Sequence, residues 1–240
     1  MSAHRFWEID FFRGLAIIMM IVFHSLYDIN YFGVYNIPLF SGFWLYFARI
    51  TAGTFIFLFG ISMTISYSRA KSTLTQNQLR LKFMKRGLKI FILGLLITLM
   101  TYLFLKGGFI WFGILHFIGI SVFLAYPLLK YRISNLLLGL VFIVLGFFLA
   151  GLVFDFPWLL WLGLRPASFY TLDYFPLFPW LGLALIGVFF GNVLYKNNKR
   201  QFKVPNIPNR NPICFLGRHS LIIYLLHQPI LIAFLYLFVL

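Results

Sequence analysis

The sequence predicts an all-α polytopic membrane protein, a bundle of about seven transmembrane helices with a cytoplasmic N-terminus and an external C-terminus. Of its 240 residues, 62% are hydrophobic and only 10% are charged, whereas soluble domains are about 25% charged. The apolar runs are long and continuous rather than alternating, which argues against a transmembrane barrel. No repeat or low-complexity tract divides the chain, so we predict a single domain over residues 1–240.

Seven apolar segments approach or exceed the roughly 20 residues that cross the hydrocarbon core of a bilayer. They occupy residues 10–29, 42–68, 87–105, 110–129, 133–153, 174–195 and 218–239. The segment 155–173 is too short and too interrupted to cross. Its tryptophan, proline and phenylalanine residues suit the membrane interface or a re-entrant loop.

The basic residues give the orientation. With seven spans, 17 of the 20 Lys and Arg residues fall on one side, in segments 1–13, 69–89, 130–132 and 196–218. The positive-inside rule makes that side cytoplasmic, so we predict a multi-pass protein of the cell membrane. The basic rim contacts anionic lipid or, in part, receives a polyanionic cytosolic ligand. Because the charge is confined to one face, we expect no nucleic-acid partner.

The first apolar segment carries ionisable residues along one stripe. Arg13 and His24 are eleven residues apart, which on a helix is three turns plus about 20° and roughly 16 Å along the axis. Asp10 and Asp28 lie within about 60° of the same line. Ionisable side chains inside a membrane are costly and therefore indicate function. The stripe predicts a polar path that runs through the bundle.

His24 and Asp28 are the candidate catalytic residues. Their i,i+4 spacing lets the carboxylate hydrogen-bond the imidazole, fix its tautomer and raise its basicity. Such a histidine can act as the general base toward a hydroxyl or an amine. The competing interpretation is a structural histidine held by a neighbouring helix. Arg13 either anchors the phosphate or pantetheine of a coenzyme or reaches out to lipid headgroups.

Five further polar residues form a second rank of candidates for the substrate site. His116 is expected near the depth of His24, where it either shares a cavity with His24 or is a buried structural histidine. On the last span, Pro229 predicts a kink, and polar residues on one face either line the site or join helices. Arg49 begins the second span and is either an acceptor-binding residue or an interfacial anchor. The set is Arg49, His116, Tyr224, His227 and Gln228.

Five segments in order resemble a known family. RGLAIIMMIVFH (residues 13–24) fits the arginine, ten residues, histidine signature of the transmembrane acyltransferase superfamily. With FLFGISM, FGILHFIGIS, FPLFPWLGLALIG and LGRHSLIIYLLHQPI, the chain is similar to prokaryotic members of the heparan-alpha-glucosaminide N-acetyltransferase catalytic-domain family. The resemblance implies Arg13 and His24 as the matched functional pair. Heparan-acetylating members also use a histidine after the first span, and residues 30–41 contain none. Either His24 handles the acyl group here, or the chemistry differs.

The resulting hypothesis is a transmembrane O- or N-acyltransferase. It would move an acyl group, with acetyl-CoA the expected donor, to a hydroxyl or amine outside, on a glycan or lipid-linked sugar. No metal is expected, because the single cysteine, Cys214, has no metal-type Cys/His cluster around it. The alternatives are a small carrier or flippase that uses the His/Asp stripe as a proton or solute path, and a non-catalytic assembly subunit. A homodimer is left open.

Overall fold

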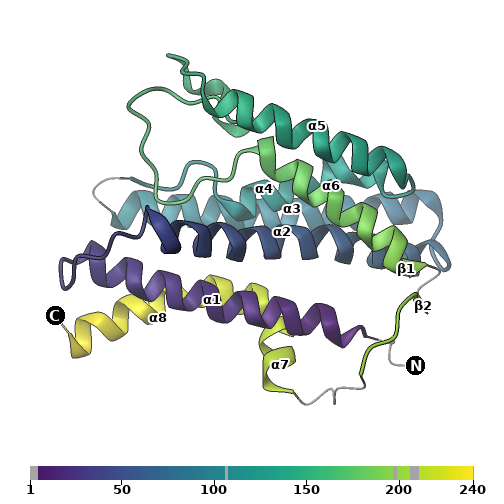
Figure 1. Cartoon of the computed structure of the whole chain (residues 1–240), viewed down its shortest axis with the longest axis horizontal. Helices are drawn as coiled ribbons and strands as arrows, with labels where there is room; N and C mark the ends of the chain where they lie inside the picture. Colours follow the sequence, from purple (N-terminus) through teal and green to yellow (C-terminus); the bar gives the residue numbers. More distant parts are fainter. Residues whose placement is uncertain (1–4, 106–107, 197–198, 206–210, 240) are drawn as a thin grey trace. The chain divides into compact units, whose positions relative to one another are not determined.

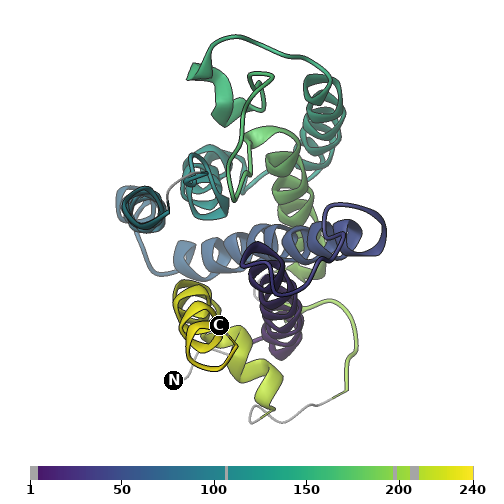
Figure 2. The same ribbon diagram turned by 90° about the vertical axis from the view of Figure 1, so that its left-hand side faces the viewer.

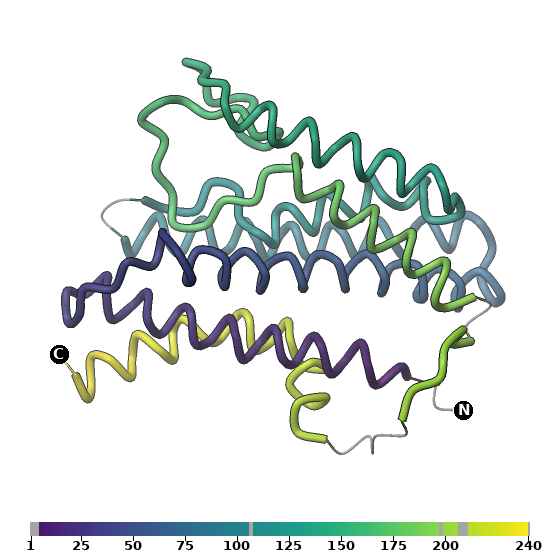
Figure 3. Tube along the Cα trace, viewed as in Figure 1, coloured from purple at the N-terminus to yellow at the C-terminus, as the bar shows by residue number. Residues whose placement is uncertain are grey.

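The computed structural model describes residues 5–105, 108–196, 199–205 and 211–239, and Figures 1 and 3 trace them. It divides into two compact units, Met1–Leu58 with Val204–Leu240, and Phe59–Lys203. The elements in chain order are α1 (Trp7–Tyr31), α2 (Gly42–Lys71), α3 (Gln76–Phe104), α4 (Ile114–Ala125), η1 (Tyr126–Leu128), α5 (Ile133–Ala150), η2 (Pro157–Leu162), α6 (Leu177–Leu194), β1 (Tyr195–Lys196), β2 (Lys199–Arg200), α7 (Pro212–Arg218) and α8 (Ser220–Phe238).

The first unit brings the two ends of the chain together. It holds α1, the first part of α2, α7 and α8. Figure 2 shows α8 beside α1, and the two helices run in the same direction. Residue pairs in contact between them advance together along both helices, from His24–His227 to Phe32–Tyr236. The stripe predicted on the first span therefore has the last span as its neighbour.

Glycines allow α1 and α7 to cross at backbone contact. A methyl group at Gly14 would overlap the carbonyl oxygen of Ile213, and one at Gly217 would overlap the carbonyl oxygen of Asp10. Helix α7 starts where the Asn211 side chain accepts a 2.8 Å hydrogen bond from the amide of Ile213, a normal N-cap. This crossing anchors the short helix that leads into α8.

The second unit is built from antiparallel helix pairs, α3 with α4 and α5 with α6, together with the later part of α2. Gly139 of α5 and Gly182 of α6 face each other, each against the other's carbonyl. The later part of α2 packs on α6, where Thr64 Oγ1 lies 3.3 Å from the carbonyl oxygen of Val188. Two antiparallel strands of two residues each, β1 and β2, follow α6.

Within the described residues, six helices are long and apolar enough to cross a membrane: α1, α2, α3, α5, α6 and α8. The sequence predicts about seven, and the difference is the segment 110–129. Only residues Ile114–Leu128 of it form a shorter apolar helix, because residues 108–113 remain extended and hydrogen-bond to other segments. The all-α polytopic bundle is confirmed.

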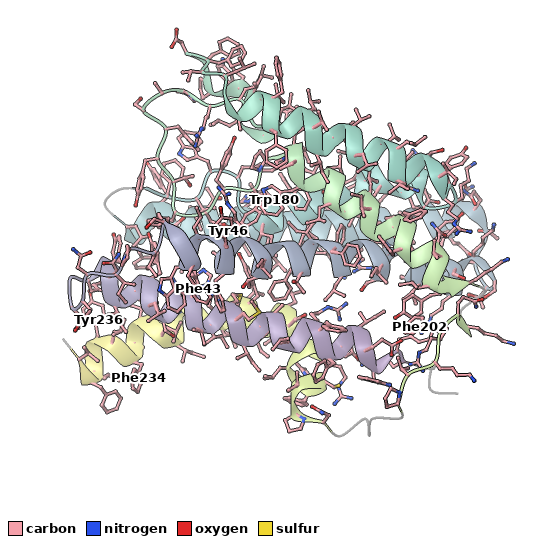
Figure 4. The ribbon with its side chains drawn as sticks, viewed as in Figure 1. Phe43, Tyr46, Trp180, Phe202, Phe234 and Tyr236 are labelled. Atoms are coloured by element: carbon pink, nitrogen blue, oxygen red, sulfur yellow. The ribbon has the colours of Figure 1, made fainter. Side chains whose placement is uncertain are left out.

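Helix α3 begins earlier than the predicted span. Thr75 and Gln78 form a reciprocal capping box, which starts the helix before the cationic residues rather than after them. Large apolar side chains stay exposed on several helices, as lipid-facing residues do. Figure 4 labels four of them, Phe43 and Tyr46 on α2 and Phe234 and Tyr236 on α8, all more than half exposed.

Candidate functional site

His24 is held by its own helix. Its Nδ1 lies 2.8 Å from the carbonyl oxygen of Met20, one turn earlier in α1. A carbonyl can only accept, so Nδ1 carries the proton and Nε2 is the nitrogen with a free lone pair. The fixed tautomer that the sequence predicts is present, but the partner differs. The carbonyl of Met20, and not the carboxylate of Asp28, orients the ring.

Asp28 has a partner that its own helix does not supply. Its side chain is buried, 3% exposed, and Oδ1 accepts a 3.1 Å hydrogen bond from Nε2 of Gln228 on α8. The second oxygen, Oδ2, is closed to solvent and has no hydrogen-bond partner among the described residues. The structure does not show the predicted hydrogen bond between Asp28 and His24, because Nδ1 of His24 is directed to the Met20 carbonyl. A catalytic role for Asp28 stays a prediction.

His227 lies against His24. The ring centroids are 4.8 Å apart, with the planes at 80°. Nδ1 of His227 is 2.6 Å from the carbonyl oxygen of Tyr224, so this ring also carries its proton on Nδ1. Its Nε2 is buried and has no partner in the described part of the chain. The two histidines, one on the first span and one on the last, therefore share the same tautomer.

These contacts define one site in the first unit, which we name the α1–α8 polar cluster: His24, Asp28, His227 and Gln228. The sequence predicts all four as candidates, but not that they meet. Tyr224 also belongs here, since its ring lies 5.6 Å from that of His227. Its carbonyl, rather than its hydroxyl, makes the contact that fixes His227.

Arg13 fastens α1 to α7. Its Nη1 is 3.3 Å from Oδ1 of Asp10 and 3.5 Å from the carbonyl oxygen of Gly217. Asp10 is buried and also pairs with Arg5 at 3.4 Å. The side chain of Arg13 is 21% exposed. A coenzyme phosphate that bound Arg13 would have to compete with this carboxylate, so its role as a coenzyme anchor stays a prediction.

Arg49 stands apart from the cluster in its contacts. Its side chain is exposed on α2 and makes no ion pair within the described residues. Among the described residues, the side-chain partner of Asp28 is Gln228 and not Arg49. Arg49 keeps its two interpretations, an interfacial anchor or an acceptor-binding residue.

His116 belongs to the second unit and has structural partners on both ring nitrogens. Nδ1 accepts a 3.2 Å hydrogen bond from the amide of Gly113, and Nε2 lies 3.3 Å from the hydroxyl of Thr98. That hydroxyl donates at 2.6 Å to the carbonyl of Ile110. His116 thus joins α3, α4 and the segment between them, as a structural residue does. A cavity shared with His24 stays a prediction.

The described residues contain no group of three or more His, Cys, Asp or Glu that could hold a metal ion.

The signal in the sequence that could have located the α1–α8 polar cluster is the pattern on α8, where His227 and Gln228 precede Pro229. Sequence reasoning missed the carbonyls of Met20 and Tyr224, because any residue type supplies a carbonyl.

A family model described as heparan-alpha-glucosaminide N-acetyltransferase, catalytic, matches residues 5–229. The match confirms the resemblance that the five sequence segments indicate. No curated protein and no solved structure matches the chain.

Proposed function

Because the chain belongs to the heparan-alpha-glucosaminide N-acetyltransferase family, a family of transmembrane acyltransferases, we propose that it moves an acetyl group across the membrane. The donor is acetyl-CoA, bound on the side that carries the basic segments. The acceptor is a hydroxyl or amine of a glycan or lipid-linked sugar on the opposite side. We place the protein in the plasma membrane, with its N-terminus cytoplasmic.

His24 supplies the general base. The observation that carries this assignment is the 2.8 Å contact between Nδ1 and the Met20 carbonyl, because it leaves Nε2 unprotonated in a buried polar cluster. Nε2 takes the proton from the acceptor hydroxyl or amine. The acceptor's electron pair forms the new bond to the acyl carbon, and the bond from carbon to sulfur breaks. The imidazolium then returns the proton to the thiolate of coenzyme A.

Asp28 and Arg13 support this step from either side along α1. Asp28 is one turn beyond His24, and its negative charge favours the imidazolium that forms there. Arg13 is about three turns before His24, and we assign it to the phosphate or pantetheine of the coenzyme. Arg5 and Arg13 both pair with Asp10. At this end of α1, a coenzyme phosphate would replace the Asp10 carboxylate as the partner of Arg13.

The test is acyl transfer across a sealed vesicle. Radiolabelled acetyl-CoA is placed on the N-terminal side and D-glucosamine on the other, and label in the sugar is counted. We expect His24→Asn, which can keep the bond to Met20, and His24→Gln, which lacks a basic nitrogen, each to lower kcat by about 100-fold or more.

His219 provides the matched control. It is exposed, and its Nδ1 lies 3.0 Å from the carbonyl of Phe215, so it makes the same backbone contact outside the cluster. His219→Asn and His219→Gln should transfer label at the normal rate. Glucosamine flux that needs no acetyl-CoA would instead support the carrier or flippase.

A further inference from the structure

The α1–α8 polar cluster contains three buried acceptor atoms that no donor satisfies in the described part of the chain. They are Oδ2 of Asp28, Nε2 of His227 and Oε1 of Gln228. The amide of Gln228 is oriented by its bond to a carboxylate, which can only accept, so Oε1 must point away from Oδ1 of Asp28. Buried polar atoms are nearly always paired in native proteins, and three unpaired atoms in one cluster require an explanation.

All three atoms have the same chemistry. Each one accepts and none donates: Oδ2 is a carboxylate oxygen, Oε1 is an amide oxygen, and the proton of His227 is on Nδ1 at the Tyr224 carbonyl. Their complement is a molecule that brings several O–H or N–H groups close together. A thioester or a phosphate offers only acceptors, so neither of these two groups of the coenzyme is the complement. The atoms are closed to solvent, so a ligand reaches them only when side chains at the contact move apart.

We propose that Asp28, His227 and Gln228 form the subsite that holds the acyl acceptor, with Nε2 of His227 receiving a hydrogen bond from a hydroxyl or amine next to the one that reacts. This assignment rests on the proposed function and divides the two histidines between two roles. His24 takes the proton, and His227 stays neutral and binds the acceptor. The site therefore selects polyhydroxylated or amino-alcohol acceptors over simple alcohols.

The neighbours of His227 support a neutral ring. The ring centroids of His24 and His227 are 4.8 Å apart, and two imidazolium charges repel strongly at that distance. Only one of the two rings is therefore expected to be positively charged at a time. The groups that contact His227 are His24 on α1 and Tyr224 on α8, and the other members of the cluster are Asp28 and Gln228. The one carboxylate among them is hydrogen-bonded to Gln228, and no ion pair to His227 is present among the described residues.

A pair of amide substitutions separates a binding role from a structural one. In His227→Asn, the amide nitrogen can replace Nδ1 and keep the bond to Tyr224, but nothing replaces Nε2. In His227→Gln, the amide oxygen can reach the position of Nε2. We expect His227→Asn to raise the KM for D-glucosamine by about 5- to 10-fold, the loss of one hydrogen bond. His227→Gln should stay within about 3-fold of the parent protein, and the KM for acetyl-CoA should not change in either.

Three kinetic outcomes would overturn the assignment. Equal losses in both variants mean that His227 is structural. No loss in His227→Asn means that it does not touch the acceptor. A fall in kcat for His227→Gln like that of His24→Gln means that His227 is the base. His219→Asn and His219→Gln, made outside the cluster, control for the substitutions themselves.

Nitrogen NMR tests binding without turnover. In the full-length protein labelled with ¹⁵N-histidine, the Nε2 resonance of His227, assigned from its absence in His227→Asn, should move when D-glucosamine or D-glucose is added. It should not move with 1-propanol, which brings a single donor. If the Nε2 resonance shifts but the protein transfers no acetyl group, the proposed function is rejected and the binding subsite is retained. Acetyl transfer to D-glucosamine without any shift would reject the subsite alone.

Discussion

Three histidines in this chain show how one residue type takes different roles according to which ring nitrogen is bonded. His24 and His227 place Nδ1 on helix carbonyls, which leaves Nε2 available for chemistry or binding. His116 has both nitrogens engaged, by Gly113 and Thr98, so it has no lone pair to offer. The role of a buried histidine is thus decided by the backbone groups around it.

Asp173 predicts a pH dependence of stability at the residue scale. Its Oδ2 accepts a 3.0 Å hydrogen bond from the amide of Ile114 at the start of α4, yet burial raises its pKa from 3.8 to about 6. The folded state therefore holds this proton more tightly than the unfolded state between pH 4 and 6. The resulting stabilisation is present at low pH and is lost as the pH rises through about 6.

Asp173→Asn should remove that slope, because the amide oxygen can still accept from Ile114 and cannot ionise. Thermal unfolding in detergent, measured from pH 4 to 7, should show the melting temperature of the parent protein falling relative to that of the variant. Parallel profiles would mean that Asp173 does not titrate in this range.

At the scale of elements, the crossing of α1 and α7 fixes where the site begins. Gly14 and Gly217 place the two backbones in contact, and Arg13 ties the end of α7 to α1. Because α8 follows α7 after a single residue, His219, this crossing sets which residues of α8 face His24. The geometry of the polar cluster is therefore inherited from a contact about three turns away along α1.

Gly14→Ala should destabilise the protein by about 1–3 kcal/mol or more, because the added methyl meets backbone that cannot rotate away. Gly151→Ala is the matched control, since its methyl would lie 3.7 Å from the nearest atom, an ordinary contact, on a residue with φ −85°. Chemical unfolding in mixed micelles measures both. Similar small losses would show that α7 can move away from α1.

Asp10 and Arg13 predict a competition between an ion pair and the coenzyme. If Arg13 binds acetyl-CoA, Asp10→Asn should lower the KM for acetyl-CoA by about 3-fold, because the carboxylate that competes for the guanidinium of Arg13 is removed. Arg13→Gln should raise it. Steady-state kinetics with acetyl-CoA as the varied substrate measures both effects. If Arg13 only joins α1 to α7, both variants should lower the melting temperature and leave the KM for acetyl-CoA unchanged.

At the scale of the whole molecule, the six long apolar helices found in the described part of the chain and the one-sided distribution of cations indicate a multi-pass protein. Helix α4 is shorter than the span predicted there, so the number of long helices among the residues that the structure describes is six and not seven. The fold class is unchanged. The sequence predicts the N-terminal side to be cytoplasmic, and Cys214 cannot report on it because its side chain is buried.

Cysteine labelling tests that orientation. Lys85 and Arg165 are both exposed and are predicted on opposite sides. With Cys214→Ala as background, a membrane-impermeant maleimide applied to intact cells should label Arg165→Cys and leave Lys85→Cys unlabelled until the cells are opened. The reverse pattern would invert the topology and with it the direction of acetyl transfer.

The sequence by itself determined the fold class, the positions of six spans, the stripe of Arg13 and His24, and the family. These follow from hydropathy and spacing, which are local properties of the chain. Only the tertiary structure decided that Asp28 binds Gln228, 200 residues away, and that His227 stands beside His24. Hydrogen-bond partners depend on which helices become neighbours, and many arrangements of apolar helices satisfy the same hydropathy.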